Sequence, residues 1–126
     1  MPKIIDYFDS FAKENDLSGT AVQKFKIVLD ELLNNIISYA FKDDDDHHIL
    51  VKFQLKYLRL IITIEDDGIP FNPFRADPPD IELSISERDL GGLGVHIVKN
   101  LVDEHHYIRQ SKRNIINLIK YNINIK

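Results

Sequence analysis

The spacing of apolar residues changes along the chain, and each change marks a different element. Pro2 and the apolar residues that follow it at helical spacing predict a short first helix, which Asn15 and Asp16 end. Residues 20–41 predict a much longer helix, because one broad face of that segment is apolar. This face consists of Phe25, Leu29, Leu32, Leu33, Ile36 and Ala40.

After a charged turn, apolar and polar residues alternate, as is typical of half-buried strands. Residues 51–56 and 58–65 show this pattern and predict a hairpin. Residues 93–104 return to helical spacing, and residues 107–111 and 115–121 predict two more strands around a turn. The order of elements predicts an α+β fold, a two-layer sandwich in which helices pack on one face of a largely antiparallel sheet.

A long irregular segment separates the two halves of this pattern. Residues 67–92 contain four of the five prolines and no sustained periodicity. A loop of this length inside a compact domain is usually a lid or a binding loop. We therefore expect residues 71–90 to form a lid that is poorly ordered without a ligand, within a single domain that covers residues 1–126.

Composition and charge narrow the class of protein. The 126 residues carry a net charge of −4, which argues against binding to nucleic acid or to an acidic membrane. Cysteine is absent, so the sequence has no disulfide, thiolate metal site or catalytic thiol. No apolar run approaches the ~20 residues that span a bilayer, and the acidic residues near the N-terminus do not fit a signal peptide. We expect a soluble, cytoplasmic protein.

Polar residues in the middle of the long helix are the first candidates for chemistry. Glu31, Asn34, Asn35 and Ser38 are predicted to share one polar wedge opposite the apolar face. Asparagine is a poor helix former because its amide competes for backbone hydrogen bonds, so two consecutive asparagines indicate a use for those amides. A solvated helix face is the alternative interpretation.

Two further motifs border the irregular segment. Asp66 and Gly68 follow the second strand, where a carboxylate can accept hydrogen bonds from a ligand and a glycine lets that ligand approach the backbone. A simple turn fits the same residues. Gly91, Gly92 and Gly94 lie where the chain leads into a predicted helix, and free N–H groups and the positive end of the helix dipole there favour phosphate. The alternative there is a glycine-rich hinge, since the lysine and hydroxyl residue of a Walker A loop are missing.

The three motifs occur in one fixed order, and together they resemble a known superfamily. The order Glu-x-x-x-Asn, Asp-x-Gly and Gly-x-Gly is similar to the N, G1 and G2 boxes of the GHKL ATPases, which include histidine kinases and gyrases. Within this superfamily, the sequence closely resembles the anti-sigma-factor serine/threonine kinase branch. The resemblance lies in the segments EDDGIPFNP and NLVDEHHYIRQSKRN, and in Glu87 and Arg88 before GGLG. The resemblance covers almost the whole chain and implies the histidine-kinase-like ATPase fold of the Bergerat type.

The resemblance implies a nucleotide site for ATP and Mg²⁺. Asp66 is expected to accept a hydrogen bond from the adenine amino group, with Gly68 beside the base. Asn35 is expected to coordinate Mg²⁺, and Asn34 precedes it in the same box. Backbone N–H groups are expected to bind the phosphates at Gly91, Gly92, Leu93 and Gly94.

The resemblance also implies two catalytic side chains. Glu31 is the expected general base, which takes the proton from a serine or threonine hydroxyl as that oxygen attacks the γ-phosphorus. Arg88 is the candidate for a γ-phosphate contact, where a guanidinium stabilises developing charge, and a surface arginine is the alternative. The implied function is a Mg-ATP-dependent anti-sigma-factor kinase that phosphorylates an antagonist protein and also binds a sigma factor or a similar partner.

The chain departs from this branch in two places. Kinases of the branch begin with a strand before the first helix, whereas this sequence starts almost at the helix, which leaves open whether it forms a homodimer through that region. The last strand has Asn114 and Asn117 in the region where many superfamily members place a threonine near the adenine pocket. The adenine contact from this side is therefore expected to be weaker or to pass through water.

The acidic run at residues 43–48, with His47 and His48, invites interpretation as a metal site. A solvated acidic turn is the preferred interpretation, because adjacent histidines in such a turn rarely converge on one ion.

A second function fits the same motifs. A regulatory module could bind ATP or ADP to order its lid and gate a partner without transferring phosphate. The catalytic piece of a histidine kinase fits less well, because the sequence has no paired dimerisation helices with a phosphorylated histidine.

Overall fold

The fold is taken from a computed structural model, which describes residues 2–43, 45–75 and 90–126. Its elements follow the order predicted from the apolar pattern. They are the helices α1 (Pro2–Glu14) and α2 (Gly19–Asn35), the π-helix η1 (Ile36–Ala40), the strands β1 (Ile49–Lys56) and β2 (Arg59–Asp66), the short 3₁₀ helix η2 (Pro73–Arg75), helix α3 (Leu90–Leu101), and the strands β3 (Glu104–Gln110) and β4 (Arg113–Lys120).

The four strands form one antiparallel sheet in the order β1-β2-β4-β3. The two predicted hairpins are present, and β2 pairs with β4 to join them in the middle of the sheet. This pairing places Asp66, the last residue of β2, directly opposite Asn114 near the start of β4. Three helices pack on this sheet, so the predicted α+β sandwich is confirmed.

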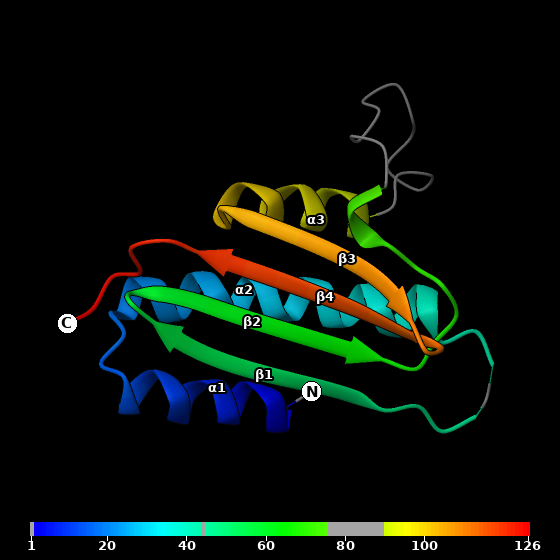
Figure 1. The fold of residues 1–126 in the computed structure, drawn as a ribbon, viewed down its shortest axis with the longest axis horizontal. Helices are drawn as coiled ribbons and strands as arrows, with labels where there is room; N and C mark the ends of the chain where they lie inside the picture. The colour runs from blue at the N-terminus through cyan, green and yellow to red at the C-terminus, as the bar shows by residue number, and fades with distance from the viewer. Residues whose placement is uncertain (1, 44, 76–89) are drawn as a thin grey trace.

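The core lies between the helices and one face of the sheet, with α2 running behind the central strands and α1 beside β1 (Figure 1). The apolar face predicted for the long helix is buried over its whole length. Alternate residues of β2 and β4 are buried against it, as period-two alternation requires. Leu60, Ile62, Ile64, Ile116 and Leu118 form this side of the core.

The long helix departs from the prediction near its end. It is α-helical only to Asn35, and residues 36–40 form the π-helix η1. The Asn35 side chain donates a hydrogen bond from Nδ2 to the carbonyl oxygen of Glu31 at 2.7 Å. Since that carbonyl is the acceptor of the helix four residues back, the amide competes with the backbone ladder where the winding changes. Single turns of π-helix often accompany functional sites.

The boundaries of α3 and β3 also differ from the prediction. Helix α3 begins at Leu90, three residues before the predicted start, and ends at Leu101, so the glycines of the third motif belong to the helix itself. Strand β3 begins at Glu104, which the prediction assigned to the helix. Glycine is a poor helix former, and this low propensity made residues 90–92 look like a loop in the sequence.

The first residues of the predicted lid are packed against the domain. The Phe71 N–H donates to Asn114 Oδ1 at 3.1 Å, and the Phe74 ring lies 4.5 Å from the ring of His105. Pro73 is buried. Residues 71–75 are therefore packed on the domain, and residues 76–89 lie outside the described part of the chain, so the lid over residues 71–90 stays a prediction. Within the described residues, no helix has the length and apolar character needed to cross a membrane.

Candidate functional site

The predicted motifs gather at one end of the domain. Figure 1 shows the end of β2, the end of α2 with η1, and the start of α3 at the same end of the molecule. The Ile69 N–H donates to the carbonyl oxygen of Ala40 at 2.9 Å, which joins the turn after β2 to η1. Glu31 of α2 lies against Gly94 of α3. Residues from three separate segments thus form one continuous region.

Asp66 is the buried acid of this region, with 1% of its surface exposed. Its Oδ1 accepts hydrogen bonds from the Gly68 N–H and from Asn114 Nδ2, both at 2.9 Å. Burial raises the pKa of Asp66, and the two hydrogen bonds act in the opposite direction. A carboxylate held in this way can serve as a directed hydrogen-bond acceptor for a ligand.

Asn114 is the side chain that organises the turn after β2, and its role was not predicted from the sequence. It is 1% exposed, and its Nδ2 also donates to the carbonyl oxygen of Ile69 at 2.8 Å. Its Oδ1 accepts from Tyr107 Oη at 2.5 Å and from Arg109 Nη1 at 3.3 Å, in addition to the Phe71 N–H. The side chain therefore uses both its donor and its acceptor groups in a buried network.

Gly68 is needed for packing. A Cβ atom at this position would lie 2.6 Å from the carbonyl oxygen of Ala40, closer than two such atoms can approach. The Gly68 carbonyl oxygen accepts from Arg109 Nη1 at 2.7 Å. The sequence suggested that this glycine admits a ligand, and the structure adds that it lets the turn pack on η1.

Gly94 of α3 lies against the Glu31 side chain of α2. A Cβ atom built on Gly94 would lie 1.8 Å from Glu31 Oε2, so the carboxylate occupies the space that a side chain would fill. Glu31 is half-buried. The candidate base therefore lies directly beside the helix whose first turn was predicted to bind phosphate.

The predicted polar wedge required Asn34 and Asn35 to share one environment, but the two side chains lie in different ones. Asn35 is 4% exposed and lies on the buried side of α2, whereas Asn34 is exposed. The bond from Asn35 Nδ2 to the Glu31 backbone holds the amide one helical turn along from the candidate base. Of the two asparagines, only Asn35 combines burial with an ordered amide.

The remaining predicted residues are placed only in part. Gly91, Gly92 and Leu93 lie in the first turn of α3, where backbone N–H groups lack intrahelical partners. Phosphate binding by these N–H groups stays a prediction. Arg88 lies outside the described residues, as does Glu87.

His47, which the sequence analysis assigned to a solvated acidic turn, has an ordered side chain in the structure. Its Nε2 lies 2.6 Å from Asp43 Oδ1, its Nδ1 lies 2.9 Å from Asp67 Oδ1, and its ring stacks on Phe41 with centroids 4.3 Å apart. Its side chain is only 14% exposed, so the interpretation as a solvated turn was wrong for this residue. Among the described residues, no group of three or more potential ligands could hold a metal ion.

These contacts shift the pKa values of all three groups. Hydrogen bonds to Asp43 and then to Asp67 raise the pKa of His47, and the same bond to His47 lowers the pKa of Asp43. Burial acts to raise the pKa of Asp67, but hydrogen bonds from the His48 N–H and from His47 hold it below its usual range. The result is a carboxylate–imidazole–carboxylate clamp next to Asp66.

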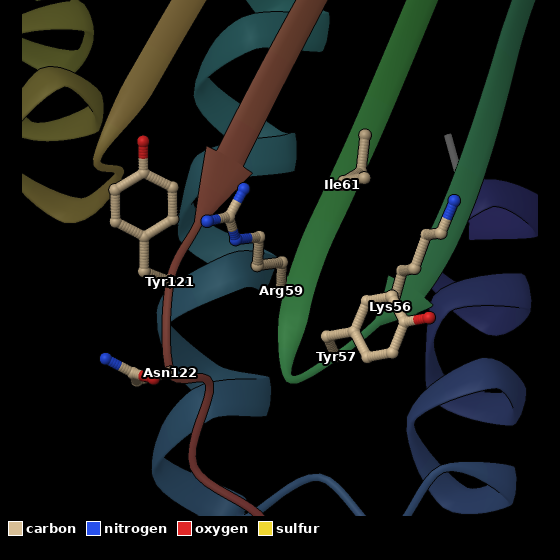
Figure 2. A pocket seen from close by; sticks show the side chains of 6 residues that line it. All are labelled: Lys56, Tyr57, Arg59, Ile61, Tyr121 and Asn122. Atoms are coloured by element: carbon tan, nitrogen blue, oxygen red, sulfur yellow. The ribbon is translucent and has the colours of Figure 1, made fainter.

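A pocket of about 690 Å³ lies at the other end of the sheet, around the β1–β2 hairpin (Figure 2). Arg59 begins β2 there, whereas Asp66 ends it. The Arg59 guanidinium lies 4.9 Å from the centre of the Tyr121 ring. Because the lining contains none of the predicted motifs, this pocket is separate from the candidate site. It is lined by Lys56, Tyr57, Arg59, Ile61, Tyr121 and Asn122.

The residues at the candidate site fit a magnesium nucleotide. Asp66 offers a carboxylate acceptor at the buried end of β2, which suits an exocyclic amine of a base. The Asn35 amide nitrogen is bound to the helix backbone, which leaves the amide oxygen as the atom for a metal. Carboxylate and amide oxygens are the ligands that Mg²⁺ takes in proteins. The first turn of α3 adds N–H groups for phosphate oxygens.

Comparison with known proteins supports the same interpretation. Residues 1–120 match the family model described as histidine kinase-like ATPase domain. The chain is similar to the serine-protein kinase RsbW of Listeria monocytogenes, with 26% identity over 97 residues that cover 74% of this chain and 62% of the relative. It is also similar to RsbW of Bacillus mycoides, with 30% identity over 87 residues that cover 66% of this chain and 54% of the relative.

Solved structures show the same fold at lower identity. The histidine kinase domain of the blue-light activated kinase of Erythrobacter litoralis aligns with a TM-score of 0.58 and 20% identity, covering 79% of this chain and 44% of that one. The histidine kinase AdeS of Acinetobacter baumannii aligns with a TM-score of 0.55 and 18% identity, covering 99% of this chain and 62% of that one. The chain therefore spans between 44% and 62% of the length of these relatives.

Proposed function

Because the chain belongs to the histidine kinase-like ATPase domain family, we propose that it binds Mg-ATP and phosphorylates a serine or threonine of a protein partner. By analogy with the anti-sigma-factor kinases that the sequence resembles, the substrate is an antagonist protein, and a sigma factor or similar regulator is a second partner. The serine-protein kinases among its relatives support a hydroxyl acceptor. The assignment is to this domain, whose relatives are longer.

In this proposal, different elements bind the adenine base and the phosphates of the nucleotide. Asp66 accepts the adenine amino group at the end of β2, and Gly68 keeps the turn closed against η1. The N–H groups of Gly91, Gly92 and Leu93 in the first turn of α3 bind phosphate oxygens.

Asn35 is the proposed metal ligand. Its amide oxygen would hold Mg²⁺, while the hydrogen bond from Nδ2 to the Glu31 backbone fixes which atom of the amide faces the metal. When bound, the ion neutralises phosphate charge and orients the γ-phosphoryl group.

Glu31 carries the proton transfer. Its carboxylate takes the proton of the incoming hydroxyl while that oxygen forms a bond to the γ-phosphorus. The bond between the γ-phosphorus and the β–γ bridging oxygen breaks, and ADP leaves. The single observation that carries the proposal is the position of Glu31 against Gly94, because it places a carboxylate beside the helix start that suits phosphate.

The test is phosphate transfer from γ-labelled ATP to a candidate antagonist domain. We expect label on a serine or threonine of the antagonist. Glu31→Gln should bind Mg-ATP about normally, since this carboxylate need not contact the nucleotide in the ground state, and should reduce transfer by about 10²–10⁴-fold. Asp30→Asn is the matched control, because Asp30 is an exposed acid next to Glu31 on the same helix.

The outcomes distinguish a kinase from a nucleotide-gated binding module. Transfer that is lost in Glu31→Gln and kept in Asp30→Asn supports the kinase. If the protein binds ATP but labels no cognate antagonist, the kinase assignment is wrong and a nucleotide-gated binding module takes its place. If it binds no ATP, the whole proposal is wrong.

A further inference from the structure

The two oxygens of the Asp66 carboxylate have different surroundings. Both hydrogen bonds to this carboxylate, from the Gly68 N–H and from Asn114 Nδ2, end on Oδ1. Within the described part of the chain, no hydrogen bond reaches Oδ2. The side chain is almost fully buried, so the orientation of the carboxylate is set by these bonds and not by solvent.

Asn114 controls that orientation from the neighbouring strand. It lies directly opposite Asp66 in the sheet, and its Nδ2 bridges Asp66 Oδ1 and the Ile69 carbonyl oxygen at 2.9 and 2.8 Å. The amide cannot turn over, because its Oδ1 accepts the Phe71 N–H together with Tyr107 and Arg109. Five hydrogen bonds thus hold one asparagine in one orientation.

We propose that Asn114 is a specificity-determining positioning residue, which occupies Asp66 Oδ1 so that Asp66 presents only Oδ2, as an acceptor, to the base of the nucleotide. The inference rests on the proposed nucleotide site. An acceptor at this place pairs with the 6-amino group of adenine and meets the 6-oxo group of guanine as a second acceptor. A site with a buried polar group left unpaired rejects the wrong ligand strongly.

This mechanism predicts a role for the donor of Asn114 that is separate from its bulk. Asn114→Val removes the donor, and Asn114→Thr has nearly the same shape as valine but keeps a hydroxyl that can donate to Asp66. Asn117→Val is the control on the same strand, because Asn117 lies opposite Thr63 and accepts its hydroxyl at 2.7 Å on the other side of β4.

The experiment measures Kd for ATP and for GTP by calorimetry for the wild-type protein and the three variants. A freed Asp66 can rotate or take a proton and then donate to a 6-oxo group. We expect Asn114→Val to lose roughly ten- to hundredfold of the ATP-over-GTP preference, the range expected for one unpaired buried group. Asn114→Thr should recover most of that preference, and Asn117→Val should keep it.

A second measurement does not depend on nucleotide. Carbon-13 NMR of the nucleotide-free protein reports the titration of the Asp66 carboxyl, and removing a donor from the carboxylate should raise its pKa in Asn114→Val but not in Asn117→Val. If the wild-type protein binds no nucleotide, the proposed function fails, and this titration alone decides whether Asn114 positions Asp66. An ATP-over-GTP ratio or an Asp66 titration that is the same in Asn114→Val and wild type overturns the inference. If Asn114→Val does not fold, Asn114→Thr decides. A shifted Asp66 titration together with the wild-type ATP-over-GTP ratio in Asn114→Thr would show that the donor to Asp66 does not set the preference, and it overturns the inference too.

Discussion

His47 shows how a single side chain joins two loops beside the candidate site. It connects Asp43, after η1, to Asp67, next to the buried Asp66. A neutral imidazole has one N–H, whereas the charged ring has two and can donate to both carboxylates. The clamp is therefore complete only when the ring is protonated and both acids are ionised.

The clamp makes stability depend on pH with a defined sign. The pKa of His47 is raised above its usual 6.5, so its contribution is fully present below pH 6.5 and is lost as the pH rises through the raised pKa. The pKa values of Asp43 and Asp67 are lowered from 3.8, so their contribution is present above pH 3.8 and is lost as the pH falls through the lowered values. The clamp is complete between these limits.

We predict that His47→Gln destabilises the protein most within this window, near pH 5 to 6. The difference from wild type should shrink as the pH rises through the titration of His47. Denaturant unfolding across the pH range measures this difference, and NMR titration locates the pKa of the ring. The control is His48→Gln, since His48 is exposed and contributes its backbone N–H to Asp67. A difference that does not vary with pH would show that the histidine acts by packing alone.

At the scale of elements, two glycines hold different pairs of segments together. A Cβ atom at Gly68 would meet the backbone of Ala40, which cannot move without shifting η1, and one at Gly94 would meet the end of the Glu31 side chain, which can rotate away. The same substitution should therefore have different consequences at the two positions.

We predict that Gly68→Ala costs about 1–3 kcal/mol of unfolding free energy, as overpacking does. Gly94→Ala should change stability by less than about 1 kcal/mol, because the gain in helix propensity offsets the displaced carboxylate. It should nevertheless reduce phosphate transfer, since Glu31 must leave its position. Gly19→Ala is the control, because no atom lies within 4 Å of the added Cβ. Thermal unfolding and transfer assays of the three variants make the comparison. Full transfer activity in Gly94→Ala would contradict the role of this contact.

Element types were predictable from the sequence, but the details that build the site depend on tertiary contacts. The spacing of apolar residues predicted all four strands and the buried face of α2, because burial on one side of an element imposes that spacing. It missed the π-helix, since a hydrogen bond from Asn35 acts through geometry that periodicity does not report. The sequence pattern also missed the role of Asn114 in binding Asp66, because only the pairing of β2 with β4 brings this residue opposite Asp66.

At the scale of the whole molecule, the candidate site ties the two halves of the chain together. The helix with Glu31 and Asn35 precedes the first hairpin, and α3 precedes the second. The middle of the sheet joins Asp66 to Asn114 across 48 positions of sequence. A ligand that contacts α2, the end of β2 and the start of α3 at once should stabilise the complete fold, since it binds only when all three are in place.

We predict that Mg-ATP raises the melting temperature of the whole domain and that Asn35 is responsible for the magnesium part of that rise. Ligand at about 100 times its Kd adds about 2.7 kcal/mol to the folded state. Asn35→Ala loses the hydrogen bond to Glu31 as well as the metal ligand, so its melting temperature without ligand should already be lower. The informative quantity is therefore the further shift that Mg²⁺ causes when ATP is present.

That further shift should be clear in the wild-type protein and small in Asn35→Ala, while the shift caused by ATP in the presence of a chelator should be similar in both. Asn34→Ala is the matched control, because Asn34 is the adjacent asparagine but is exposed, and its magnesium-dependent shift should equal that of the wild type. Differential scanning calorimetry of the three proteins with ATP, with and without Mg²⁺, supplies all the values. If Asn35→Ala keeps the full magnesium-dependent shift, the metal is held elsewhere, and the buried amide serves only to end the α-helix at the start of η1.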